Sequence, residues 1–166
     1  MKKFLKTIVI AVIIILLLAQ FYPKYNYNNG DALIPASIET SHKVPAEVAA
    51  ILKTSCYDCH SNHTEYPWYA NIQPISKWLT NHIDEGKGEL NFSEFGSYSL
   101  RRQYHKLEEI AEQIEENEMP LSSYTLIHSD ASLSETQKKT LTSWVNNLRD
   151  SFKMVYPVDS LQRKRS

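Results

Sequence analysis

The feature that most constrains this 166-residue chain is a pair of cysteines three positions apart, followed directly by a histidine. The residues are Cys56, Cys59 and His60, in the sequence CYDCH. The chain has no further cysteine, so a framework of several disulfides cannot stabilise its fold. In the CxxCH pattern, two thiols bond to haem and the histidine binds its iron. The sequence therefore predicts one covalently attached haem c, with Cys56 and Cys59 as attachment residues and His60 as the proximal iron ligand.

The spacing of the motif suits this chemistry. Two thiols three positions apart lie on one face of a helical turn, where they can reach the vinyl groups of neighbouring pyrroles. The alternatives are a structural disulfide between Cys56 and Cys59, a redox-active dithiol, and a zinc site. A dithiol motif normally follows a strand in a βαβ unit, and zinc needs a fourth ligand from a second metal-binding group. The sequence shows neither feature, so haem is favoured.

Met119 is the favoured sixth ligand of the iron. It stands where a predicted helix ends and Pro120 forces an extended backbone. A thioether binds iron well, and Met with His raises the reduction potential relative to two histidines. Of the other methionines, Met1 is the initiator and Met154 lies beyond the last predicted helix. The main alternative is His82, on the apolar face of a helix, where a core histidine or a hydrogen bond to a haem propionate is also compatible with the pattern.

The fold class indicated by the sequence is all-α. Apolar residues recur at helical spacing in four stretches, and nothing alternates as a strand. These stretches cover residues 45–52, 75–83, 100–114 and 134–148. The second helix should end near Gly86 and Gly88, and Ser134 with Gln137 forms a capping box for the fourth. We expect a cytochrome c-like domain of about four short helices, with long loops around one haem.

The first 22 residues differ in character from the rest. Lys2, Lys3 and Lys6 precede an apolar run that extends to Ala19. A helix from residue 4 to residue 22 is about 28 Å long, close to the hydrocarbon thickness of a bilayer. A cleaved signal peptide has a similar start, but small residues of the A-x-A kind are missing. A single transmembrane anchor in the inner membrane is therefore favoured, with the haem domain facing the periplasm. A soluble periplasmic domain after cleavage is the alternative.

Four segments are predicted along the chain. Residues 1–22 are the anchor or signal, and residues 23–44 form a tether with turn-forming Asn and Gly. Residues 45–150 form the haem domain. Residues 151–166 are a basic tail that ends in Arg163, Lys164 and Arg165.

The charge of the chain limits its partners. A net charge of −1 gives no basic field for nucleic acid. Residues 42–150 hold 10 Lys and Arg against 16 Asp and Glu, and six of these acids lie between Glu108 and Glu118. A solvated helix face explains such a cluster, but it could also steer a basic partner. The expected partners are redox proteins, basic or membrane-bound, together with the membrane itself through the N-terminal helix.

Beyond the motif, the chain resembles the cytochrome c-like haem-binding domain family of small exported bacterial proteins. The resemblance lies in residues 56–69 (CYDCHSNHTEYPWY), 82–95 (HIDEGKGELNFSEF) and 118–128 (EMPLSSYTLIH), and in Trp144. It implies one haem bound covalently at Cys56 and Cys59, with His60 as a ligand.

The function expected from these features is that of a membrane-anchored monohaem c-type cytochrome. It would transfer single electrons on the periplasmic side, as a carrier rather than a catalyst. The alternative is an open-site haem enzyme or sensor, peroxidase-like or gas-binding, in which Met119 does not hold the iron.

Overall fold

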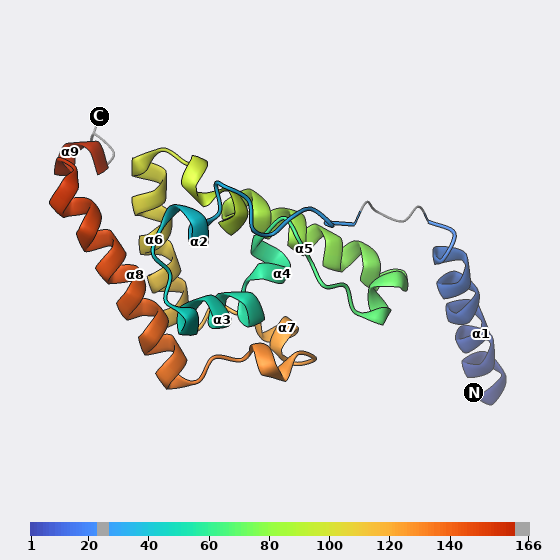
Figure 1. Ribbon diagram of the computed structural model, residues 1–166. Helices are drawn as coiled ribbons and strands as arrows, with labels where there is room; N and C mark the ends of the chain where they lie inside the picture. The colour runs from blue at the N-terminus through green and yellow to red at the C-terminus, as the bar shows by residue number, and fades with distance from the viewer. Residues whose placement is uncertain (23–26, 162–166) are drawn as a thin grey trace.

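The computed structural model describes residues 1–22 and 27–161, and its regular structure there is helical (Figure 1). Within those residues no β-strand occurs, and one isolated bridge pairs Asn29 with His63. The α-helices are α1 (Lys2–Ala19), α2 (Ile38–Ser41), α3 (Ala46–Ser55), α4 (Tyr57–His60), α5 (Ile75–Glu89), α6 (Leu100–Glu115), α7 (Ser122–Thr125), α8 (Glu135–Val155) and α9 (Val158–Leu161). The 3-10 helices are η1 (Trp68–Asn71), η2 (Phe92–Ser97) and η3 (Ser129–Ala131).

Helices α6 and α8 pack side by side and form the centre of the main core (Figure 1). On α6, Leu107, Ile110 and Ile114 recur at three- and four-residue spacing and are buried, so one stripe of the helix faces inward. Leu141 and Val145 form the matching stripe on α8 and are fully buried. The remaining members of this core come mainly from α2, α3, α4, η2 and α9, and include Ile38, Val48, Leu52, Tyr57, Phe95 and Leu161.

The motif helix α4 lies between α3 and α5 and contacts both (Figure 1). A second, smaller apolar cluster lies beside it. Leu79 and Ile83 of α5 pack there with Ala70 of η1, and Cys59 packs against this cluster from α4. Cysteines of the motif therefore contribute to both cores, since Cys56 packs against the main one.

The segment before α3 lies along the domain. Ser37 and Ile38 are buried, and the Gly96 amide donates a 2.7 Å hydrogen bond to the Ala36 carbonyl. The Trp144 indole donates to the Lys43 carbonyl at 3.2 Å. Of the predicted tether, residues 27–44 therefore contact the domain through several polar groups, whereas residues 23–26 lie outside the described part of the chain.

The expectation of about four short helices is wrong. The described residues contain nine α-helices, and α5, α6 and α8 have 15, 16 and 21 residues. Three helices that the sequence did not indicate, α2, α7 and α9, are single turns of four residues. A single turn is too short to show the apolar repeat on which the prediction relied.

The predictions of an N-terminal transmembrane helix and of a single-pass inner-membrane location are also wrong, because none of the described helices is long and apolar enough to cross a membrane. Helix α1 ends at Ala19 and carries Lys2, Lys3 and Lys6 in its first turns. The uninterrupted apolar stretch from Ile8 to Ala19 has 12 residues. It is about 18 Å long, short of the roughly 30 Å of a hydrocarbon core.

At the other end of the chain, α8 continues to Val155 and buries Phe152, so the first residues of the predicted basic tail belong to this helix. Arg163, Lys164 and Arg165 lie outside the described residues.

Candidate haem-binding site

The motif occupies a single helical turn. Helix α3 ends at Ser55, and Cys56 forms both the end of α3 and the start of α4. The Cys56 amide donates to the Leu52 carbonyl at 2.9 Å, and its own carbonyl accepts from the amides of Cys59 and His60 at 3.2 and 2.9 Å. Both thiols are free. This turn places the two cysteines and the histidine next to one another on a short, hydrogen-bonded backbone.

His60 is held in one orientation by the end of α5. Its Nδ1 lies 2.9 Å from the Gly86 carbonyl and 3.0 Å from the Leu90 carbonyl. Carbonyls only accept hydrogen bonds, so Nδ1 carries the hydrogen and Nε2 keeps its lone pair. A backbone carbonyl behind Nδ1 is the usual support of a metal-binding histidine, because it fixes the ring and makes Nε2 more basic.

Gly86 allows α5 to approach the motif this closely. A Cβ at this position would lie 2.8 Å from the Cys59 carbonyl oxygen and 3.4 Å from Cε1 of His60. Helix α5 ends at Glu89, directly after Gly88, so the expected position of its end is confirmed, but neither glycine is the capping residue, which is Leu90. Gly86 is there for close packing against α4, a reason that the local sequence does not reveal.

The protonation states around the motif follow from burial. Burial lowers the pKa of His60 below its ordinary value, against the opposing effect of the Leu90 and Gly86 carbonyls, and keeps the imidazole neutral. Burial also raises the pKa of Cys56 to about 12 and that of Cys59 to about 11. A redox-active dithiol needs a lowered thiol pKa, so the surroundings disfavour that alternative.

An apolar cavity of about 390 Å³ brings three of the four predicted site residues together. Cys56, His60 and Met119 all line it. Most of the remaining wall is apolar, made by Leu90, Phe92, Ile110, Ile114, Pro120 and Leu133. The structure thus places the predicted proximal and distal ligands on one cavity, although they are 59 positions apart in the chain.

Cys59 lines a second apolar cavity, of about 350 Å³. Trp68, Trp78 and Leu121 line it as well. The turn with the cysteines and the segment Met119–Leu121 therefore each contribute to both cavities. A flat, apolar cofactor bonded to both cysteines would need both cavities, and these two segments line both of them.

Met119 is positioned by the way α6 ends. Asn117 has a φ of 61°, the left-handed conformation that closes many helices. The Glu118 and Met119 amides both donate to the Gln113 carbonyl, at 2.9 and 3.2 Å, which turns the chain back over the last turn of α6. The sequence prediction did not include Asn117, although an Asn directly after a helical stripe is a recognised stop signal.

The histidines that compete with Met119 lie elsewhere. His82 lines the second cavity, and its Nδ1 donates to the Trp78 carbonyl at 2.9 Å. His42 hydrogen-bonds Gln103, and His105 lies 2.9 Å from the Glu109 carboxylate on α6. His63 and His128 line a different hollow. None of these five shares the cavity of His60 and Met119.

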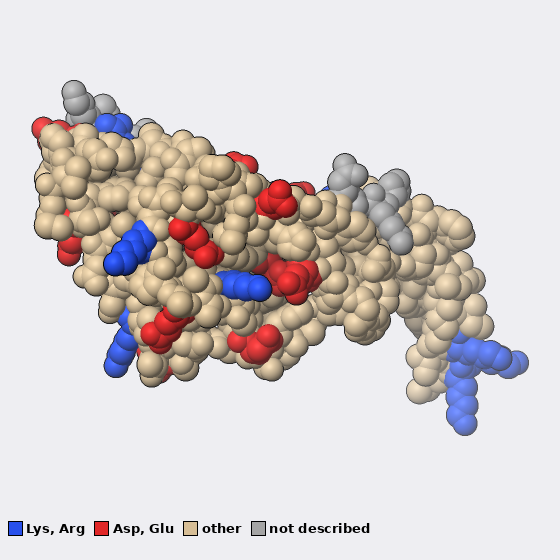
Figure 2. All heavy atoms as spheres, viewed as in Figure 1, with Lys and Arg blue, Asp and Glu red and all other residues tan. Residues whose placement is uncertain are grey.

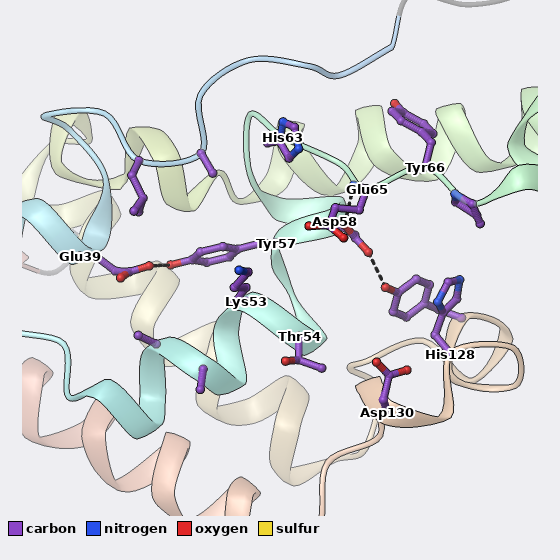
Figure 3. A pocket seen from close by; sticks show the side chains of 16 residues that line it. Glu39, Lys53, Thr54, Tyr57, Asp58, His63, Glu65, Tyr66, His128 and Asp130 are labelled. Atoms are coloured by element: carbon purple, nitrogen blue, oxygen red, sulfur yellow. Dashed lines mark hydrogen bonds between the residues drawn. The ribbon is translucent and has the colours of Figure 1, made fainter.

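That hollow, of about 1050 Å³, lies on the other side of the motif turn (Figure 3). It is lined by Tyr57 and Asp58, the two middle residues of the motif, and by none of the four predicted site residues. Tyr57 donates to Glu39 at 2.6 Å, and Tyr124 donates to Asp58 at 2.6 Å. Acidic side chains gather near the hollowed part of the face in Figure 2. The hydrogen bonds of Tyr57 and Tyr124 join α4 to α2 and α7, so contacts on this side of the motif hold the turn in place.

The donor set fits haem better than zinc. Among the described residues, no group of three or more His, Cys, Asp and Glu could hold a metal ion. A neutral histidine with a free Nε2, two thiols on one turn and apolar walls instead suit an iron porphyrin.

Comparison with protein families gives a match. Residues 14–147 match the model of a haem-binding domain. Neither the search of curated proteins nor that of solved structures found a match. The matched region contains the whole motif, both cavities and most of the core, and the chain therefore belongs to the haem-binding domain family.

Proposed function

We propose that this protein is a monohaem c-type cytochrome that carries single electrons between redox proteins. The observation that supports this proposal most strongly is the apolar cavity shared by Cys56, His60 and Met119. It contains an attachment residue and two suitable axial ligands on separate segments of the chain.

The residues of the chain would hold the cofactor from two sides. Cys56 and Cys59 would form the thioether bonds from one turn, and a single motif means a single haem. His60 would bind the iron through Nε2, oriented by the Gly86 and Leu90 carbonyls. Met119 would bind from the turn that follows α6. The bound haem would supply an iron that gains and loses one electron.

The surroundings favour a carrier over a catalyst. If His60 and Met119 both bound the iron, they would leave no open position for a substrate. Phe92, Ile110 and Ile114 line the cavity and would limit access of water to the metal. The chain then needs only to hold the ligands and to leave an edge of the haem accessible to a partner.

The acids of α6 support a basic partner. Glu108 pairs with Arg149, and Glu109 pairs with Lys106. Four further acids in the last turn of α6 and directly after it are exposed: Glu112, Glu115, Glu116 and Glu118. They precede Met119 directly, so their field would attract a positively charged redox protein toward the haem side of the domain.

The test is expression together with a cytochrome c maturation system, followed by intact mass, a haem-stained denaturing gel and visible spectra. We expect one covalent haem, lost in the double variant Cys56→Ala, Cys59→Ala. Ferric protein should show the far-red absorption band of sulfur ligation. Met119→Leu should remove that band, whereas Met154→Leu should keep it, because Met154 is 81% exposed on α8.

A polypeptide mass without haem would overturn the proposal. A high-spin spectrum that Met119→Leu leaves unchanged, together with peroxide turnover, would favour an open-site enzyme instead.

A further inference from the structure

The cavity of His60 and Met119 has one polar region. Glu89 of α5 lines it, and so do Lys106, Glu109 and Gln113, which follow one another along α6 at three- and four-residue spacing. Among the described residues that line this cavity, Lys106 is the one Lys or Arg. Its side chain is only 12% exposed. A largely buried cation needs anionic partners.

Two carboxylates already contact this cation. The Lys106 Nζ lies 2.6 Å from Glu109 Oε2 and 3.2 Å from Glu89 Oε2. Burial acts to lower the pKa of Lys106, but the hydrogen bonds to Glu109 and Glu89 outweigh it and raise the pKa above its ordinary value, so the group is charged. An ammonium has three N–H groups, and two carboxylates use two of them. One donor is left for a group in the cavity.

Haem carries its vinyl groups on one edge and its two propionates on the other. Thioether bonds from Cys56 and Cys59 would fix the vinyl edge at α4. The propionates would then lie across the iron, away from the cysteines, and the cavity offers them the polar region formed by α5 and α6.

We propose that Lys106 binds a haem propionate. This inference rests on the proposed function, because it concerns the same cofactor. Glu109 at 2.6 Å would keep its contact with Lys106, while Glu89, at 3.2 Å and 81% exposed, is the partner that the propionate displaces. Lys106 would serve as a positioning residue for the cofactor edge and as a charge close to the iron.

A positive charge near the iron favours the reduced state, because reduction removes one positive charge from the haem. Loss of the Lys106 charge should therefore lower the midpoint potential, and loss of its hydrogen bond should weaken the hold on the propionate.

The test uses haem-loaded protein with Lys106→Gln. We expect haem attachment and the far-red sulfur band to persist, the midpoint potential to fall, and the propionate bending mode in resonance Raman spectra to shift. Lys106→Arg should restore the potential. The matched control is Lys153→Gln, which removes the same charge from an i,i+3 ion pair with Asp150 on α8 and should change neither readout.

An unchanged propionate mode in Lys106→Gln would overturn the inference, and so would an equal drop in potential in the control. If Lys106→Gln fails to load haem, Lys106→Arg provides the test. Because arginine keeps the positive charge, a midpoint potential of Lys106→Arg below the wild-type value would contradict a role for that charge. Failure of the wild-type chain to take up haem would instead refute the proposed function.

Discussion

At the scale of single residues, Gly86 combines two contributions at one backbone position. Its carbonyl accepts the hydrogen of His60 Nδ1, and its missing Cβ leaves room for the Cys59 carbonyl. The predicted proximal ligand, His60, is therefore oriented by the backbone of a helix that can approach only because a side chain is absent. Gly88, one half-turn further along α5, has open space around it.

We predict opposite effects of alanine at these two glycines. Gly86→Ala should lower the free energy of unfolding by about 1–3 kcal/mol, because its Cβ would overlap the Cys59 carbonyl. It should also reduce haem attachment. Gly88→Ala should raise the free energy of unfolding by up to about 1 kcal/mol, because alanine favours a helix and the added Cβ would meet no neighbouring residue within 4 Å. Denaturant unfolding and haem-stained gels measure both effects. Equal stability of the two variants would contradict the role given to Gly86.

The motif could be read from the sequence, but this supporting contact could not. The motif lies within five neighbouring residues, Cys56 to His60, so the sequence contains all of its parts. The role of Gly86 depends on a carbonyl 27 positions away, and a glycine near the end of an apolar stripe looks like a helix stop. Lys106 was missed for the same reason, since nothing in its own neighbourhood shows that it lines a cavity with His60.

At the scale of elements, the end of α6 decides where Met119 lies. Asn117 takes a positive φ, and the next two amides return to the Gln113 carbonyl. The Lys138 ammonium of α8 donates to the Asn117 side chain, which joins the turn to the neighbouring helix. The position of Met119, the proposed distal ligand, thus depends on a turn geometry rather than on burial of its own side chain.

We predict that this turn tolerates glycine but not a β-branched residue. Asn117→Val should cost about 1–2 kcal/mol, because a left-handed conformation is strained for such a side chain. It should also weaken the far-red sulfur band. Asn117→Gly should keep the band, because glycine adopts this conformation readily. Spectra and unfolding curves of both loaded variants give the answer. Loss of the band in the glycine variant would show that the amide side chain, and not the backbone, holds the turn.

Local signals gave correct predictions at other helix ends. The capping box of Ser134 and Gln137 is confirmed, with both side chain-to-backbone hydrogen bonds present. Such a box involves only four neighbouring residues, so the sequence contains all of its parts. No local pattern of this kind marks the single-turn helices α2 and α7.

At the scale of the whole molecule, His42 joins three parts of the fold. Its ring lies between Phe95 of η2 and Phe152 of α8, with centroids 5.8 and 5.6 Å away. Its Nε2 donates to the Gln103 side chain of α6 at 3.1 Å. Burial lowers the pKa of His42, and the hydrogen bond to Gln103 opposes this only in part. The folded state therefore favours the neutral form of the His42 imidazole.

This arrangement predicts a loss of stability in weak acid. The unfolded chain binds a proton at His42 more readily than the folded one. The contribution of His42 to the free energy of unfolding is therefore fully present above pH 6.5, its ordinary pKa. This contribution decreases as the pH falls from 6.5 to the lower pKa of the folded state. His42→Gln should flatten this dependence in haem-loaded protein. Denaturant titrations between neutral pH and about pH 5 measure the slope. An unchanged slope in His42→Gln would contradict the prediction.

Helix α1 stands apart from the other helices (Figure 1), and none of its residues is buried. Its link to the domain is an amide pair, in which Gln20 donates to the Gln73 carbonyl at 2.9 Å and accepts from the Gln73 amide at 3.1 Å. Trimming the chain to begin at residue 27 would therefore remove a large exposed apolar surface and, among the contacts of the described residues, break these two hydrogen bonds to the domain. Such a shortened version should be the easier one to concentrate and crystallise, with its haem pocket intact.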